Sequence, residues 1–320
     1  MKTKKRVFSF ILAMVVAFAV IITPKFDTNA ATYISAPSNV FQVSASGNTL
    51  TVGWTAVSGA VQYNYVVRVG GSTGAVALTG AVASNGLKLT GVRAGVNYYV
   101  SVASVAADGT TSYYTYGTRV YAIPDSPKNI YLDTWTPDSN NPYIKWTGYN
   151  SSLSGAYYPD GYQVKITSLG GKNVGTYTVS SESLYKNLPR IKNAGFKIKI
   201  RTYKTISTYN GQKKKLYSKW SKVKTFVPQP KMGGHYSTRD SKGELSWKGV
   251  KNAKSYTVYK VTQTTNSYKL TKIKTVPGSV NKIPVPRHAK YTVIATVKAG
   301  SKTIKGTNKD RRYISVVTFN

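Results

Sequence analysis

The chain has 320 residues, with 45 Lys and Arg against 10 Asp and Glu, so its formal net charge is +35. It contains no cysteine, which excludes a disulfide framework and thiolate zinc sites and leaves apolar cores as its source of stability. The large positive charge favours anionic partners.

The N-terminus has the three-part layout of a secretory signal peptide. Four basic residues lie within the first six, an uncharged apolar stretch runs from Val7 to Ile22, and small residues up to Ala30 follow Pro24. This layout predicts a signal peptide at 1–30, cleaved after Ala30. An uncleaved anchor is the weaker alternative, because a bilayer core needs about 20 apolar residues in helical form. We therefore expect a secreted chain, extracellular or cell-wall associated and without a later membrane span, from a Gram-positive bacterium.

The positive charge is unevenly distributed along the chain. Five basic residues and one acid precede residue 31, so a net +31 follows them. Residues 31–123 hold four basic residues and one acid, a net +3, which leaves +28 in residues 124–320. Anionic partners are therefore expected at the C-terminal two thirds of the chain.

The spacing of aromatic residues reveals an internal repeat. After both Trp54 and Trp247, a valine, an alanine and a tyrosine follow at offsets three, six and nine, and another tyrosine follows at offset 44. These positions are Val57, Ala60, Tyr63 and Tyr98 in one copy and Val250, Ala253, Tyr256 and Tyr291 in the other. A looser middle copy has Trp146, Tyr162 and Phe196, with extra residues in the loop "NSSLSGAYYPD". Three copies of one structural unit are predicted.

The apolar pattern predicts strands throughout. Alternation such as Phe196, Ile198, Ile200, bounded by turn residues, is typical of half-buried strands, and no segment after residue 30 has a capped helical period. Proline-containing stretches at 123–127 and 227–231 are interpreted as linkers. We expect an all-β fold of three tandem antiparallel β-sandwiches. They are predicted to span residues 31–124, 125–228 and 229–320.

These residues resemble the fibronectin type III family. The stretch "LTGVRAGVNYYV", Leu89 to Val100, is similar to the family's Leu-x-Gly-Leu-x-Pro-Gly stretch before a strand F tyrosine, with Val92 for the second Leu and Ala94 for Pro. The resemblance implies that Tyr98 forms a tyrosine corner, in which its hydroxyl bonds the backbone upstream. It covers nearly all of residues 33–320, but the family's sandwich hosts many unrelated functions.

Motifs for catalysis and metal binding are weak. Ser72 lies in a Gly-x-Ser-x-Gly match, but alternating apolar residues flank it, so we interpret it as part of a hairpin turn and not as a nucleophile. His235, Ser237 and Asp240 lie too close along the chain for a triad, and His288 is expected in a loop before a strand. We therefore predict a non-enzymatic protein with no catalytic residues, no metal site and no cofactor.

The main candidate binding site is basic and lies in the predicted middle sandwich. In "FKIKIRTYK" the cations alternate with buried apolar residues and so face outward. In "GQKKKLYSKWSKVKTF" a lysine-rich hairpin loop is expected to lead into the last strand, with Trp220 facing outward and Tyr217, Val223 and Val227 on the opposite face. The predicted polyanion-binding residues are Lys197, Lys199, Arg201, Lys213, Lys214, Lys215, Trp220, Lys222 and Lys224.

The same residues have a structural explanation. Trp220 and Ser221 resemble half of the Trp-Ser-x-Trp-Ser box of cytokine-receptor members of the family, whose rings stack between strand F cations, and Tyr217 takes the place of the earlier Trp. A cation over an indole contributes about 0.5–1 kcal/mol when exposed. Like charges on adjacent strands also repel, and a bound anion would compensate them.

Three functions follow as alternatives. The first is a secreted adhesion protein whose basic modules attach to anionic polymers such as teichoic acid, sulfated or acidic glycans, or extracellular DNA. The second is a protein ligand that binds an extracellular receptor through the nearly neutral first unit, whose stretch "TSYYTYGTRVY" is rich in the tyrosines that interfaces favour. The third is an accessory module for a separate carbohydrate-degrading enzyme.

Overall fold

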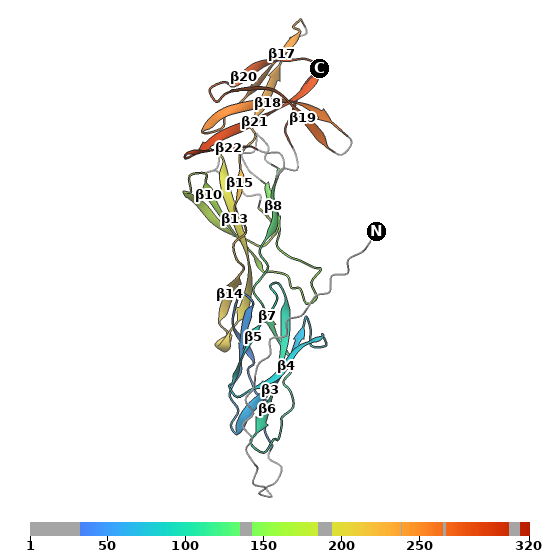
Figure 1. Ribbon diagram of the computed structural model, residues 1–320, viewed down its shortest axis with the longest axis vertical. Coiled ribbons are helices and arrows are strands. Elements are labelled where there is room, and N and C mark those ends of the chain that lie inside the picture. The colour runs from blue at the N-terminus through green and yellow to red at the C-terminus, as the bar shows by residue number, and fades with distance from the viewer. Residues whose placement is uncertain (1–32, 135–142, 185–193, 238, 265–266, 307–313) are drawn as a thin grey trace, which may run out of the picture.

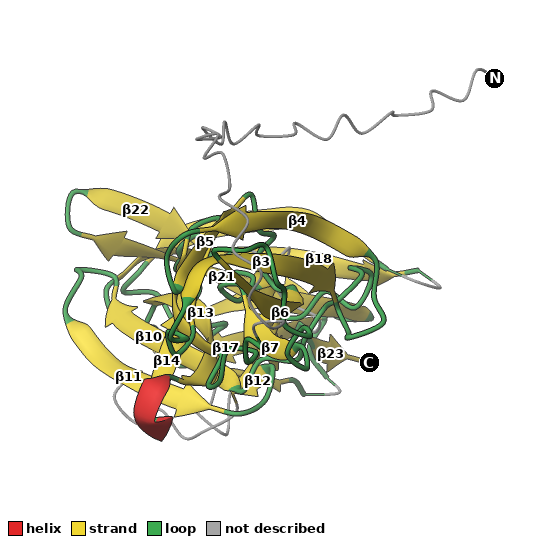
Figure 2. Cartoon of the chain, turned by 90° about the horizontal axis from the view of Figure 1, so that it is seen from below, coloured by secondary structure: helices red, strands yellow, loops and turns green. Residues whose placement is uncertain are grey.

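The computed structural model describes residues 33–134, 143–184, 194–237, 239–264, 267–306 and 314–320, so the predicted signal peptide lies outside the described residues. Six antiparallel sheets form three sandwiches that follow one another along the long axis (Figure 1). The described residues contain strands and one 3-10 turn, η2 (Tyr209–Gly211), shown in red in Figure 2. The predicted all-β class with tandem sandwiches is confirmed. No helix within the described ranges is long and apolar enough to cross a membrane.

The first sandwich packs three strands against four. The smaller sheet has the order β1-β2-β5 and the larger the order β4-β3-β6-β7. Their bounds are β1 (Phe41–Ser46), β2 (Thr49–Gly53), β3 (Ala60–Val69), β4 (Val76–Val82), β5 (Gly86–Thr90), β6 (Asn97–Ala106) and β7 (Thr118–Tyr121). The turn that joins β3 to β4 holds Ser72, which confirms the hairpin interpretation of that motif.

The second sandwich has a small sheet of order β12-β9-β8 and a larger one of order β11-β10-β13-β14, in which β15 also pairs with β13. The small sheet consists of β8 (Lys128–Thr134), β9 (Tyr143–Thr147) and β12 (Ser183–Leu184). The large sheet consists of β10 (Gly161–Ser168), β11 (Asn173–Val179), β13 (Phe196–Ser207), β14 (Lys213–Tyr217) and β15 (Lys224–Phe226).

The third sandwich repeats this plan with the orders β16-β17-β20 and β19-β18-β21-β22, and β23 also pairs with β21. The first three of these strands are β16 (Met232–His235), β17 (Lys242–Trp247) and β20 (Lys282–Pro286). The others are β18 (Ala253–Gln263), β19 (Tyr268–Pro277), β21 (Ala289–Ala299), β22 (Lys302–Lys305) and β23 (Val317–Phe319).

Each sandwich has its own apolar core, built on one aromatic pair of the repeat. The tryptophan packs edge-on against the tyrosine of the next strand, with ring centroids 5.4 Å apart in all three copies. The pairs are Trp54 with Tyr63, Trp146 with Tyr162, and Trp247 with Tyr256. All six residues are buried, so the sequence repeat marks the centres of the three cores.

The predicted tyrosine corner is confirmed. The Tyr98 hydroxyl accepts a bond from the Arg93 backbone N–H (2.9 Å), and the Tyr291 hydroxyl donates to the Pro286 carbonyl (2.8 Å). Both bonds reach back five residues. In the middle copy Phe196 packs against Phe226 instead, with ring centroids 5.4 Å apart. The first and third sandwiches are therefore closed by a corner that the second lacks.

The stretch 227–231 is packed and is not a free linker. Val227 belongs to the core of the third sandwich. The Gln229 side chain donates to the Ser315 carbonyl (2.8 Å) and accepts from the Ser315 N–H (2.9 Å). Gln42 makes the same pair of hydrogen bonds to the Tyr121 backbone in the first sandwich, at 2.6 and 2.9 Å. In both sandwiches the glutamine side chain thus makes the two hydrogen bonds that the backbone of a neighbouring strand would otherwise make.

The long loop of the middle sandwich, residues 150–160, is bonded to the first sandwich. We call this loop the strap. Gly155 accepts bonds at its carbonyl from the Asn97 backbone N–H (2.9 Å) and from the Asn97 side chain (2.8 Å). The Tyr157 hydroxyl donates to the Ala122 carbonyl (2.6 Å), and burial raises the pKa of this phenol, which keeps its proton in place. The strap therefore belongs to two sandwiches at once.

The hairpin of β13 and β14 makes a second contact with the first sandwich. Tyr209 at its tip packs against Phe41, with ring centroids 4.9 Å apart. Nearer the second core, the Lys204 ammonium lies 5.0 Å from the centre of the Tyr121 ring and pairs with Asp160 of the strap at 2.6 Å. The strap and the hairpin together hold the first two sandwiches in one orientation.

We predict that Gly155→Ala loosens this joint. Gly155 has φ +72°, and a Cβ there would lie 2.9 Å from the Gly70 backbone nitrogen. The ensemble of molecular dimensions that fits the small-angle X-ray scattering should become wider, while the three cores stay folded. Gly171→Ala is the matched control, because Gly171 has φ +92° but no atom within 4 Å of its Cβ position. Equal behaviour of the two variants would contradict the role of the strap.

Candidate functional site

The predicted alternation along β13 is confirmed. Phe196, Ile198 and Ile200 are at most 1% exposed and point into the second core. Lys197, Lys199 and Arg201 alternate with them and are partly exposed on the other face of the strand. The core thus fixes the direction of three cations, because consecutive side chains of a strand point to opposite faces.

Two aromatic rings hold Arg201 between them. Its guanidinium carbon lies 4.6 Å from the centre of the Trp220 ring and 3.9 Å from that of Tyr217. Its Nε donates to Gln163 Oε1 at 2.8 Å. The stacking continues at both ends, since Lys199 lies 4.9 Å from the Trp220 ring and Lys215 lies 4.2 Å from the Tyr203 ring. We call this set the ladder: Lys199, Trp220, Arg201, Tyr217, Tyr203 and Lys215.

Two serines explain how both rings reach the same face. Ser218 and Ser221 lie between β14 and β15, where their hydroxyls accept bonds from the Thr202 N–H (2.9 Å) and the Ile200 N–H (3.0 Å). Their own N–H groups donate to the carbonyls of the same two residues, at 3.0 and 2.8 Å. The contacts repeat every three residues, as in a polyproline II helix. Tyr217 and Trp220 therefore face the same side.

The prediction that Tyr217 and Trp220 lie on opposite faces is wrong for this reason. It assumed the two-residue period of a strand, which holds only within β14 and β15. The change of period also moves the residues that follow. Val223 is 55% exposed and does not point inward, and Lys224 pairs with Ile198, which places it on the face opposite the ladder. Val227 is buried as predicted, but in the third core.

The lysine triplet is also placed differently from the prediction. Lys213, Lys214 and Lys215 lie in β14, not in a loop, and the hairpin turn is formed by residues 208–212. Lys213 pairs with Ser207 and Lys215 with Thr205, on the ladder face. Lys214 pairs with the buried Ile206 and so lies on the other face. Lys222 is exposed beyond Trp220.

The ladder face has an excess of positive charge. Lys199 lies directly across from Lys165 of β10, so two like charges are neighbours on one face. The ion pairs seen within the described residues are Lys204 with Asp160 and Lys282 with Glu244. In that part of the chain no carboxylate lies within 4.0 Å of a ladder cation. The rings stabilise these cations without neutralising them.

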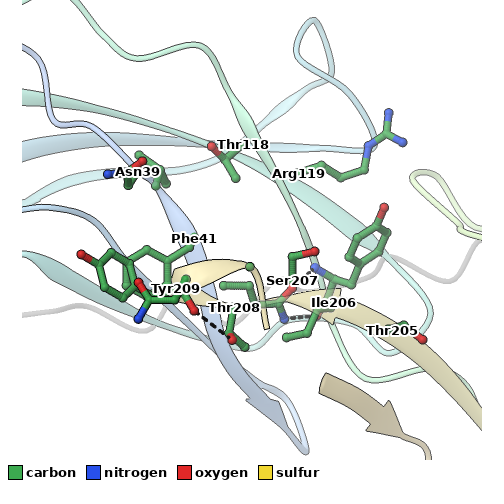
Figure 3. A pocket seen from close by; sticks show the side chains of 14 residues that line it. Asn39, Phe41, Thr118, Arg119, Thr205, Ile206, Ser207, Thr208 and Tyr209 are labelled. Carbon is green, nitrogen blue, oxygen red and sulfur yellow. Dashed lines mark hydrogen bonds between the residues drawn. The ribbon is translucent and has the colours of Figure 1, made fainter. Parts of the chain in front are cut away.

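A cavity of about 670 Å³ lies at the joint of the first two sandwiches (Figure 3). Phe41 and Tyr209 lie along one side and Thr118 and Arg119 along another. Two of its polar side chains already have partners, because Arg119 donates to the Tyr99 hydroxyl (2.5 Å) and Gln42 donates to the Tyr121 carbonyl. The sequence gives no signal for it, since its walls come from β1, β7 and the end of β13. We regard it as a gap between two docked surfaces.

The histidines do not form a site. His235 lies in β16 across from Glu244, and His288 lies just before β21, as predicted. No group of three His, Asp or Glu side chains in the described residues is placed to hold a metal ion.

The fold and the ladder together define a modular β-sandwich protein with a basic face. Residues 35–118 match the family model of the fibronectin type III domain. The first sandwich is therefore similar to the fibronectin type III domain, and such domains are generally non-catalytic binding modules.

Known proteins with related sequence or fold include human Tenascin-N and solved arrays of fibronectin type III domains. Human Tenascin-N is 32% identical over 151 residues, which is 46% of this chain and 11% of Tenascin-N. The FN1–FN3 domains of chicken CNTN1 align over 85% of this chain and 98% of that one, with a TM-score of 0.31 and 12% identity. A segment of two fibronectin type III domains from chicken tenascin aligns over 61% of this chain and 100% of that segment, with a TM-score of 0.31 and 18% identity.

We predict that Trp220→Ala weakens the middle sandwich locally. Both Lys199 and Arg201 lose a ring, and each contact contributes about 0.5–1 kcal/mol. Hydrogen exchange should become faster at the amides of Ile200 and Thr202, which bond the two serines. Lys222→Ala is the control, because Lys222 is exposed and such changes are usually within about 0.5 kcal/mol. Unchanged protection in Trp220→Ala would contradict a structural role for the ladder.

Proposed function

We propose that this is an extracellular, non-enzymatic binding protein built from three fibronectin type III-like modules. The outer face of the middle module attaches it to an anionic polymer of a cell wall or host surface, such as teichoic acid, a sulfated or acidic glycan, or extracellular DNA. The proposal is supported by the charge of +28 in residues 124–320 and by the binding role that is general among such modules.

The observation that carries this proposal is a row of pre-positioned cations that has no acidic neighbour among the described residues. Lys197, Lys199 and Arg201 alternate along one face of β13, so their Cα atoms are spaced by about 7 Å. Stacking holds Lys199 and Arg201 in place, which reduces the conformational entropy that they would lose on binding. A regular polyanion can follow such a row.

Arg201 is the central anion-binding group in this proposal. Trp220 and Tyr217 stack against its guanidinium, and Gln163 accepts from Nε. The remaining N–H groups lie at the edge of the guanidinium plane, where a phosphate, sulfate or carboxylate binds in a fork-like geometry. The ladder is then both a structural support and a holder of the binding group.

A second candidate function rests on the loop between β6 and β7. Tyr116 is fully exposed and Tyr113 is 89% exposed, beside a half-exposed Tyr114. Tyrosine combines large contact area with low conformational entropy and is enriched at protein interfaces. The nearly neutral first module therefore offers a surface for an extracellular protein receptor, separate from the basic face.

The binding of immobilised teichoic acid, heparin-like glycan and DNA should depend steeply on salt. We predict that Lys165→Gln, Lys197→Gln and Lys222→Gln together lower the slope of log K against log salt concentration by up to about three. No ring contact is observed for these lysines among the described residues, so the ladder stays intact. The test is biolayer interferometry between 50 mM and 300 mM salt.

The matched control changes Lys269, Lys272 and Lys274 of β19 to glutamine, which removes the same charge from an exposed strand of the third sandwich. The slope should then fall less than in the first triple variant. Equal slopes for the two variants would mean that binding depends on the net charge of the chain and not on its position, which would contradict a site on the middle module.

A further inference from the structure

Strand β4 leaves one edge of the first sandwich unpaired and uncharged. It ends the sheet order β4-β3-β6-β7, and its seven residues are exposed except the last, which is partly buried. Val76 is 50% exposed and Leu78 is 38% exposed. No charged residue occurs from position 69 to position 87. An exposed apolar edge strand presents free N–H and C=O groups to another strand.

The corresponding strand of the third sandwich is protected. Strand β19 also ends its sheet and is also mostly exposed, but it carries Lys269, Lys272 and Lys274. Lysines on an edge strand prevent pairing with another chain, because their burial beside a second strand is unfavourable. The two strands occupy the same place in the repeat, so their charge distinguishes the first unit from the third, whereas the equivalent strand β11 of the middle unit is also uncharged.

The sequence of β4 is close to self-complementary. It reads "VALTGAV", and antiparallel pairing with itself about Thr79 sets Val76 against Val82 and Ala77 against Ala81. Leu78 then lies opposite a glycine, which leaves space for the larger side chain, and two threonines meet at the centre. Small apolar and Thr–Thr pairs are favourable across antiparallel strands.

The charge distribution favours such pairing at the first unit. Residues 31–123 carry a net charge of +3 and residues 124–320 carry +28. The first and third sandwiches lie at opposite ends of the elongated chain (Figure 1). Two copies joined at the first sandwich therefore meet where the charge is low, and repulsion beyond about 8–10 Å is screened at physiological salt.

We propose that β4 is a homodimerisation edge, at which two copies of this chain pair through antiparallel β4 strands about a two-fold axis. The contact is isologous, so each copy satisfies the open edge of the other. It joins the two four-stranded sheets into one continuous sheet. A dimer also presents two basic faces to the same polymer, which raises the apparent affinity through effective concentration.

Sedimentation velocity on residues 31–320, which include all three cores, tests this proposal. At physiological salt the chain should shift from monomer to dimer as its concentration rises. Ala77→Lys with Thr79→Lys copies the protection of β19 and should leave a monomer with the same melting temperature. Thr271→Lys, on the protected edge strand β19, is the control and should dimerise like the unchanged chain.

Crosslinking locates the contact, because the chain has no cysteine of its own. Thr79→Cys should give a covalent dimer with a short bis-maleimide, and Thr271→Cys should give none. A chain that stays monomeric over the concentration range, or a dimer that survives the two lysines and is not crosslinked at position 79, would overturn the proposal.

Discussion

The stacking of Arg201 between Trp220 and Tyr217 is the contact that organises the outer face of the middle sandwich. Phe196 takes the place of the tyrosine of the corner, so this sandwich lacks the hydroxyl bond that closes the other two. Instead, two serines and two rings attach residues 217–221 to β13. The same attachment holds the cations on an outer face. The same residues thus stabilise this part of the sandwich and orient its cations toward the outer face.

The middle sandwich also organises its neighbours. Its strap reaches Asn97 and Ala122 of the first sandwich, and its β13–β14 hairpin packs Tyr209 on Phe41. On its other side, Leu169 packs against the core of the third sandwich. The extra residues that make this copy the loosest match to the repeat form the strap, which is one of these contacts.

Sequence patterns predicted the fold because each relevant signal is local. Alternation places Ile198 and Ile200 inside, and the equal spacing of Trp54 and Trp247 from their tyrosines reflects one core geometry. The face of Trp220 could not be predicted in this way. Serine hydroxyls replace backbone partners there, so the period changes from two to three, and Val223 and Lys224 shift with it. The contact between the first two sandwiches could not be predicted from local patterns either, since it pairs Gly155 with Asn97, 58 residues earlier.

Nuclear magnetic resonance of the side-chain N–H groups tests the central claim, that the ladder positions cations for an anionic polymer. The indole N–H of Trp220 and the Nε–H of Arg201 should shift as a teichoic acid or sulfated glycan is added. The buried indoles of Trp54, Trp146 and Trp247 should not shift, and they serve as internal references. Saturable binding of these polymers with no change at Trp220 and Arg201 would contradict the account.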